Sequence, residues 1–270
     1  MAADQPLDSG YGPTARPGDN LCNDFQRETA QSFAVLGEAR GDRVHRIAGD
    51  LTMADASSPL PFVNRAVLEQ PLTDPDAVEH TLKQLRAFYG AAGDGLFLLD
   101  SAWPTPDLRD HGFMLMGHPP LMVRPPNIPL PAGPPELRIT AVTDNVSAAD
   151  FERTLIDGYP APMLQPFERV RLFTPDALTA AGWTHFVGYV DDRAVATGST
   201  YVGGQLLRVD NIATLEGARG RGYGLAITAA AIAADLTKTA ALIASDLGRP
   251  IYERLGFVAM SRTTYWLGTR

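Results

Sequence analysis

Alternating apolar and polar residues predict strands in the second half of the chain. The segments are Leu137 to Val142, Trp183 to Val190, Ala194 to Val202 and Gln205 to Thr214. Turn residues at Asp191-Asp192 and Gly203-Gly204 separate the last three segments, so we predict an antiparallel meander.

Helical spacing and further apolar runs complete this pattern. Ser147 is a candidate cap for a helix that runs to Gly158, and a second helix follows the meander, with apolar residues on one face at Leu225, Ala229, Ile232 and Leu236. Three further elements follow. They are a short strand from Ala240 to Ser245, a short helix from Arg249 to Leu255 that ends at Gly256, and a segment of alternating residues from Phe257 onward. The order predicts an α/β fold with a mixed, mostly antiparallel central sheet and helices on both faces.

Proline-rich segments divide the chain. Residues 1–20 combine Gly and Pro with little apolar material, and we expect a disordered tail there. Residues 125–135 contain Pro125, Pro126, Pro129, Pro131, Pro134 and Pro135, which predicts a semi-rigid linker. The predicted domains are therefore residues 21–124 and 136–270, as separate folding units.

Composition narrows the function classes. The 270 residues are 45% hydrophobic and 20% charged, with a formal charge of −8, which is typical of a soluble globular protein and argues against nucleic acid or an anionic membrane as partner. Cys22 is the single cysteine and the five histidines are mostly far apart, so we expect no metal site. The first ten residues lack an apolar leader pattern, and we expect a cytoplasmic protein.

A glycine-rich loop joins the meander to the following helix. Gly217, Gly220, Gly222 and Gly224 lie where several free amides and the positive end of a helix converge, which favours anion binding. Arg219 and Arg221 add positive charge. From the glycines alone, a flexible hairpin-to-helix turn is an equally good interpretation.

Two familiar phosphate loops fit this segment poorly. A Walker A loop needs Lys after its last glycine, but Tyr223 follows Gly222 and the chain has only Lys83 and Lys238. A dinucleotide loop needs GxGxxG in a parallel βαβ unit, whereas these glycines alternate and the preceding strands are predicted to be antiparallel.

Two motifs together resemble those of the GCN5-related N-acetyltransferases. Arg219-Gly220-Arg221-Gly222-Tyr223-Gly224 is similar to the Q/R-x-x-G-x-G/A loop of that family, and Tyr252 to Phe257 is similar to its Y-x-x-x-G-F element. Both occur in the family's order and with about its separation. The resemblance covers residues 136–270.

The resemblance implies a fold that binds acetyl-CoA as co-substrate in a gap between two splayed parallel strands, with no metal. The implied acetyl-CoA-binding residues are Ile212, Ala213, Thr214, Arg219, Gly220, Arg221, Gly222, Tyr223, Gly224 and Ser245, the last standing where the family frequently has Asn. The loop amides would hold the pyrophosphate, and the backbone of Ile212 to Thr214 would polarise the thioester carbonyl.

Two residues are the implied catalytic groups. Tyr252 would protonate the leaving thiolate, and its alternative is a core tyrosine with one satisfied hydroxyl. Asp210 is the candidate general base, nine residues before Arg219, and its alternative is a solvated carboxylate on a strand. Trp103, Tyr159 and Trp183 are candidates for an acceptor pocket, although core packing explains them better.

The first half shows traces of the same pattern. Asn64 to Glu69 parallels Asn211 to Glu216, and Gly112-Phe113 parallels Gly256-Phe257, with a helix and a strand predicted between these anchors. The segment matching the phosphate loop, Leu72 to Ala77, has no glycine, and Leu108 stands where the second half has Tyr252. We therefore expect a degenerate second copy.

These observations predict an N-acetyltransferase that moves an acetyl group directly from acetyl-CoA to a primary amine. The alternative is a non-catalytic acyl-CoA-binding or regulatory module. The acceptor is expected to be a small-molecule or peptide amine. A monomer is favoured, because a linked inactive copy can replace a dimer partner.

Overall fold

The computed structural model describes residues 20–91, 93–159 and 162–270. The predicted tail, residues 1–20, lies outside them apart from Asn20, which caps the first helix. The helices are α1 (Leu21–Arg40), α2 (Pro75–Tyr89), α3 (Asn145–Gly158), α4 (Pro175–Leu178), α5 (Tyr223–Ile232) and α6 (Arg249–Arg254). Short 3₁₀ turns are η1 (Pro61–Val63), η2 (Arg109–His111), η3 (Pro162–Leu164) and η4 (Glu216–Ala218).

The strands are β1 (Arg43–Ile47), β2 (Leu51–Asp55), β3 (Arg65–Leu68), β4 (Leu96–Ser101), β5 (Met114–Gly117), β6 (Pro120–Arg124), β7 (Arg138–Ala141), β8 (Trp183–Val190), β9 (Arg193–Val202), β10 (Leu206–Thr214), β11 (Thr239–Ile243), β12 (Val258–Arg262) and β13 (Thr264–Thr269). They form a six-stranded sheet in the order β1-β2-β3-β4-β13-β5 and a seven-stranded sheet in the order β12-β6-β11-β10-β9-β8-β7. Both sheets are mixed and mostly antiparallel, as predicted.

The second half follows the predicted order of elements closely. The turn between β8 and β9 places Asp191 and Asp192 at positive φ, as a tight hairpin turn requires. Two local predictions are wrong. Helix α5 ends at Ile232, so Leu236 lies beyond it and is exposed. Asp144, not Ser147, caps α3, and the Ser147 hydroxyl reciprocates toward the Asp144 backbone in a capping box.

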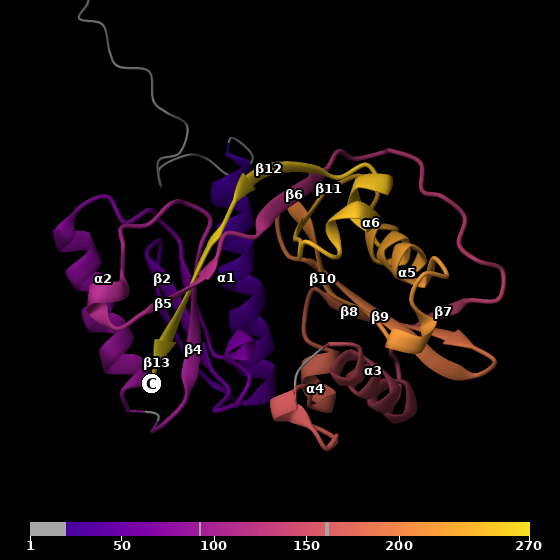
Figure 1. The fold of residues 1–270 in the computed structure, drawn as a ribbon, viewed down its shortest axis with the longest axis horizontal. Helices are drawn as coiled ribbons and strands as arrows, with labels where there is room; N and C mark the ends of the chain where they lie inside the picture. Colours follow the sequence, from indigo (N-terminus) through magenta and orange to yellow (C-terminus); the bar gives the residue numbers. More distant parts are fainter. Residues whose placement is uncertain (1–19, 92, 160–161) are drawn as a thin grey trace, which may run out of the picture.

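The two sheets exchange one strand each. β6 belongs to the first half of the sequence but pairs with β11 and β12, and β13 belongs to the second half but pairs with β4 and β5. In Figure 1, β13 runs away from the lobe that carries α5 and α6 into the lobe that carries α2. This differs from the expectation of separate folding units, because each sheet is completed by the other half.

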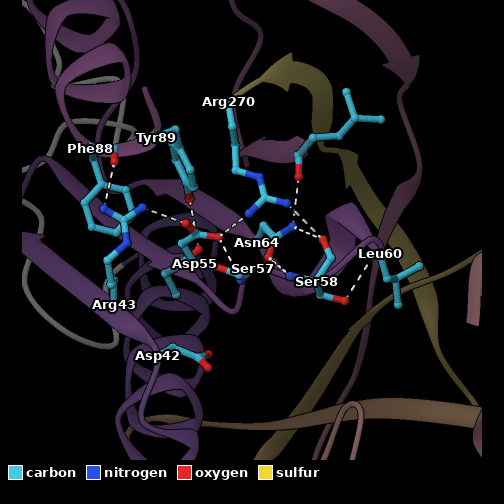
Figure 2. Close-up of polar contacts among 12 residues, drawn as sticks. Asp42, Arg43, Asp55, Ser57, Ser58, Leu60, Asn64, Phe88, Tyr89 and Arg270 are labelled. Atoms are coloured by element: carbon cyan, nitrogen blue, oxygen red, sulfur yellow. Dashed lines mark hydrogen bonds and ion pairs between the residues drawn. The ribbon is translucent and has the colours of Figure 1, made fainter. Parts of the chain in front are cut away.

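Arg270, the residue after β13, is anchored inside the lobe that carries α2, which we call the first lobe; the lobe that carries α5 and α6 is the second lobe. Figure 2 shows the Arg270 guanidinium between the carboxylate of Asp55 and the backbone carbonyl of Ser58. The Arg270 Nη1 atom lies 3.0 Å from Asp55 Oδ1, and Arg43 Nη2 contacts the other carboxylate oxygen at 2.6 Å. The Arg270 side chain is 4% exposed, so this anchor is part of the interior.

Helix α1 lies between the two lobes (Figure 1) and links them through buried polar side chains. Gln26 donates to the backbone carbonyl of Asp100 in β4 at 3.0 Å. On the other side, Glu28 accepts from the amide of Leu206 at 2.9 Å, and Ser32 accepts from Arg208, both in β10. The helix therefore joins both sheets directly.

The proline-rich linker packs along the second lobe. A Cβ added to Gly133 would lie 3.0 Å from the Ala226 side chain of α5, and one added to Gly222 would lie 3.3 Å from Pro134. The linker begins beside Arg124, whose buried guanidinium donates to the Leu255 carbonyl at the end of α6 at 2.7 Å.

Each half contains one parallel strand pair with a helix between its strands. Arg65 faces Leu98 in the pair β3 and β4, and Leu206 faces Thr239 in the pair β10 and β11, so both partners are 33 residues apart in sequence. The equal spacing of these two βαβ units supports the predicted repeat.

Candidate acyl-CoA site

Strands β10 and β11 pair at one end and separate toward the other. Their parallel register covers Leu206 to Arg208 of β10 and ends opposite Ala241. Immediately afterwards β10 contains a β-bulge against β9, between Asp210 and Ala213. Because a bulge bends and twists its strand, the second part of β10 turns away from β11 and its backbone groups on that side become available.

The glycine loop lies at the far end of this separation. Gly220 and Gly222 have φ of +78° and +84°, and Gly222 is the residue before the first turn of α5. Side chains are disfavoured in this backbone conformation, so glycine permits the chain to turn directly into the helix. The first amides of α5 have no intrahelical acceptor and point out of the helix end, as in a phosphate cradle. A Cβ added to Gly220 would meet nothing within 4 Å, so the space over the loop is open.

The side chains of this loop differ in where they point. Arg219 turns back, and its guanidinium donates to the carbonyls of Thr214 at 3.2 Å and Gly158 at 3.0 Å. Tyr223 is buried and its hydroxyl donates to Glu136 at 3.1 Å. The exposed side chain of Arg221 can face a bound anion, whereas Arg219 and Tyr223 offer the loop their backbones.

Tyr252 lies on α6, beside the end of β11. It is 8% exposed and its ring contacts Phe257 edge-on. Gly248 leaves room for it, since a Cβ there would lie 3.0 Å from the Tyr252 ring. Burial raises the pKa of Tyr252, and the negative forms of Tyr159 and Asp210 raise it further. The hydroxyl therefore stays protonated at neutral pH.

Ser245 precedes α6 and shapes its first turn. The Ser245 hydroxyl accepts from the amide of Gly248 at 3.1 Å, and its carbonyl accepts from the amide of Arg249 at 2.9 Å. The exposed Ser245 side chain still has its hydroxyl proton available to a ligand at the end of β11.

Asp210 is held by an arginine that the sequence analysis did not identify. The buried guanidinium of Arg208 contacts the Asp210 carboxylate at 2.8 Å, and the Asp210 side chain is 30% exposed. Arg208 in turn donates to Ser32 of α1 and lies over the ring of Phe25. The α1 helix thus fixes the position of the carboxylate, while one face of the carboxylate remains open.

Tyr159 completes a group of three titratable residues at the separation of the strands. Burial around its hydroxyl, together with the Asp210 carboxylate, raises the pKa of Tyr159 to about 12, although nearly half of the residue is exposed. Asp210 acts on the pKa of both Tyr159 and Tyr252, so the three groups lie within electrostatic range of one another. Trp103 and Trp183 are buried and do not join this group; packing accounts for them.

In the described residues of the first half, the corresponding strands β3 and β4 do not separate. Directly after Asn64, the counterpart of Asn211, residues Arg65 to Val67 remain paired with β4. The Arg65 guanidinium also forms a buried ion pair with Asp100, across these two strands. In place of a glycine loop, the Asp74 side chain caps α2 by accepting from the amide of Ala77 at 2.9 Å.

The described parts of the chain offer neither a metal centre nor a membrane-spanning helix. No group of three or more His, Cys, Asp or Glu side chains in residues 20–91, 93–159 and 162–270 is arranged to hold a metal ion. Over the same residues, every helix is too short or too polar for a bilayer crossing.

Comparison with known proteins identifies the fold. Neither a protein-family profile nor a curated protein sequence matches the chain. Among solved structures, a GCN5-related N-acetyltransferase from Kribbella flavida is 22% identical, with a TM-score of 0.67 over 92% of this chain and 95% of that one. An acetyltransferase-family structure from Novosphingobium aromaticivorans gives 18% identity and a TM-score of 0.54, over 83% and 90% of the two chains.

A tandem structure is also similar. It is a tandem GNAT protein from the clavulanic acid biosynthesis pathway, 12% identical, with a TM-score of 0.52 over 92% of this chain and 96% of that one. At these identities the similarity concerns the fold. The chain therefore has the fold of the GCN5-related N-acetyltransferases, and its two sheets are consistent with two such units in tandem.

Proposed function

We propose that this chain is an N-acetyltransferase that moves an acetyl group from acetyl-CoA to a primary amine. The observation that carries the proposal is the separation of β10 from β11 between a glycine loop at the start of α5 and the pair Asp210 and Tyr252. The fold alone is shared by proteins of several activities, so these residues bear the argument.

Binding is assigned to backbone groups. The amides from Gly220 to Gly224, with the side chain of Arg221, hold the pyrophosphate at the positive end of α5. The backbone of Ile212, Ala213 and Thr214 pairs with the pantetheine arm and donates to the thioester carbonyl as negative charge develops on its oxygen. The Ser245 hydroxyl assists at the end of β11.

Proton transfer is assigned to two side chains. The amine attacks in its neutral form, after it has released one proton to solvent. As its nitrogen bonds to the thioester carbon, Asp210 accepts the second proton from that nitrogen, directly or through one water. The carbon–sulfur bond breaks, and Tyr252 gives its phenolic proton to the thiolate. Burial raises the pKa of Tyr252, and it also raises the pKa of a thiol that lies beside it. The proton donor and the proton acceptor therefore keep similar pKa values.

The acceptor is a cationic amine in solution, and the exposed face of Asp210 suits it. Tyr159, about half exposed and within electrostatic range of Asp210, supplies an aromatic wall to the same side. We assign one acetyl-CoA per chain, bound by the second half, since Arg65, Asp100 and Asp74 fill or cap the corresponding places in the first half.

A thiol-release assay tests the proposal against the alternative of a non-catalytic acyl-CoA-binding module. Purified full-length protein is mixed with acetyl-CoA and a panel of small amines and peptides, and free CoA is measured with a thiol reagent beside calorimetric binding. Amine-dependent CoA release with one-to-one binding supports the enzyme. Binding without release for every acceptor supports the module, and absence of binding overturns both.

A further inference from the structure

The bulge in β10 contains a residue in an unusual backbone conformation. Asp210 faces Ser199 and Ala213 faces Thr197, so Asn211 and Ile212 together stand opposite the single residue Gly198. Asn211 has a φ of +55°. Asparagine tolerates this left-handed region better than most residues, but the conformation is still unfavourable and persists only where the surroundings hold it.

Contacts from β9 hold the bulge on both of its residues. The Asn211 side-chain amide donates to the Ser199 hydroxyl at 3.1 Å, and the Asn211 carbonyl accepts from the Thr197 hydroxyl at 3.0 Å. Ile212 packs over Gly198, where an added Cβ would lie 2.9 Å from the Ile212 side chain. The bulge is thus contacted by three consecutive residues of β9, which are Thr197, Gly198 and Ser199.

Ser199 is itself held by a buried histidine. His185 is the cross-strand partner of Ser199 in β8, and its Nδ1 atom lies 2.7 Å from the Ser199 hydroxyl. The ring of His185 is 1% exposed, stacks on Trp183 and contacts the ring of Phe151. Burial lowers the pKa of His185 to about 4, so the imidazole is neutral at neutral pH.

The chemistry of the groups fixes the direction of the first of these hydrogen bonds. The Asn211 side-chain nitrogen, Nδ2, can only donate, so the Ser199 oxygen accepts from it. Ser199 has a second lone pair and one proton left for Nδ1 of the neutral His185, and the tautomer of the imidazole sets the direction of that hydrogen bond. The result is one connected chain of hydrogen bonds that runs from Asn211 through Ser199 to His185.

We propose that His185, Ser199 and Asn211 form a positioning relay that fixes the bulge and thereby aims the backbone amides of Ile212 to Thr214 at the bound thioester. This proposal rests on the proposed function. None of the three side chains is assigned contact with the reacting atoms. They act on the reaction through the backbone of β10.

The test compares Ser199→Ala with Thr200→Val. Thr200 is the adjacent buried residue of β9, and its hydroxyl donates to the Arg208 carbonyl at 3.0 Å, across the same two strands but before the bulge. Each variant removes one buried hydroxyl from the β9–β10 pair, and we expect similar losses of melting temperature. We expect only Ser199→Ala to weaken acetyl-CoA binding and to raise its KM, by about tenfold, the scale of leaving one buried polar group unpaired.

Asn211→Gly separates the backbone conformation from the relay, because glycine adopts positive φ freely but has no side chain to donate. If the relay acts, Asn211→Gly weakens binding as Ser199→Ala does, and the double variant is no weaker than either single one. Amide hydrogen exchange of Ile212 to Thr214, measured without ligand, is expected to accelerate in both single variants and to stay unchanged in Thr200→Val.

The outcomes separate this inference from the proposed function. If Ser199→Ala and Asn211→Gly match Thr200→Val in both amide exchange and acetyl-CoA affinity, the relay is overturned while the proposed function stands. If the parent protein binds no acetyl-CoA, the proposed function fails. The relay's role toward the thioester then fails with it, and the exchange data report only whether the three residues fix the bulge.

Discussion

Arg270 and Asp55 lie 215 positions apart in sequence, yet their side chains form a buried ion pair at 3.0 Å. The pair joins the end of the last strand to the second strand of the first lobe. It shows that the two halves are connected through their sheets, and it makes the last described residue part of the structural interior.

Replacing Arg270 with Met is expected to destabilise the protein by about 3–5 kcal/mol, because Asp55 loses its buried cation. Arg43→Met is the matched control: it removes the other cation from the same carboxylate, but its side chain is 45% exposed, and we expect a loss within about 1 kcal/mol. Urea unfolding followed by circular dichroism measures both. Equal losses would contradict the assignment of Arg270 as the anchor.

Gly220→Asp is expected to abolish measurable acetyl-CoA binding, because a carboxylate would stand at the open face of the phosphate cradle. Gly220→Asn is the control, since it has nearly the same shape and the same backbone strain at φ +78° without the charge. Titration calorimetry compares the two. The cradle is misassigned if both variants bind with the same affinity.

Tyr252→Phe removes one buried hydroxyl with little change of volume. Acetyl-CoA affinity should hold while kcat falls by roughly 10²-fold, the usual scale of general acid catalysis. Tyr159→Phe removes the neighbouring hydroxyl and is expected to change kcat much less. A larger effect at Tyr159 than at Tyr252 would transfer the acid role to Tyr159.

Stability is expected to fall as the pH drops from about 6.5 toward 4, in part because of His185. Its pKa is lowered by burial from 6.5 to about 4, so between these values the unfolded chain binds a proton that the folded protein does not. This pKa difference corresponds to a loss of roughly 3 kcal/mol of stability at pH 4, and above pH 6.5 His185 causes no loss. His185→Asn, which does not titrate, should flatten this part of the stability profile in denaturant titrations, and an unchanged slope would contradict the assignment.

A fragment of residues 136–270 is expected to lack cooperative unfolding, because it loses β6 from between β11 and β12 and Arg124 from the end of α6. Adding residues 20–135 as a separate chain should restore a sharp melting transition by supplying that strand. Size-exclusion chromatography and thermal melting check both parts. A cooperative melt of the fragment alone, at the temperature of the full chain, would argue for independent halves.

The sequence predicted the second lobe well because its signals are local. Hairpin turns such as Asp191-Asp192 and the glycine loop before α5 fix neighbouring elements through a few residues. Helix α1 was not predicted, since the residues it buries include Gln26, Glu28 and Ser32, and its apolar pattern is correspondingly weak.

The strand exchange could not be predicted from local patterns. β6 and β13 have ordinary strand sequences, and the choice of sheet depends on partners more than a hundred residues away. Arg208 was missed for a similar reason, because its place beside Asp210 depends on α1. The sequence contains one indication of the proposed relay. Asn211 lies inside a predicted strand, where asparagine is disfavoured unless the backbone bends.

The position of β13 has a consequence for the order of biosynthesis. β4 and β5 are neighbours of β13 in the sheet, so the first lobe cannot close until the ribosome has made the final strand. Until then, the inner edges of β4 and β5 remain unpaired, with the apolar Leu98 and Leu99 among their residues. During synthesis, the half that is made first therefore presents an unpaired sheet edge, to which strands of other chains can pair.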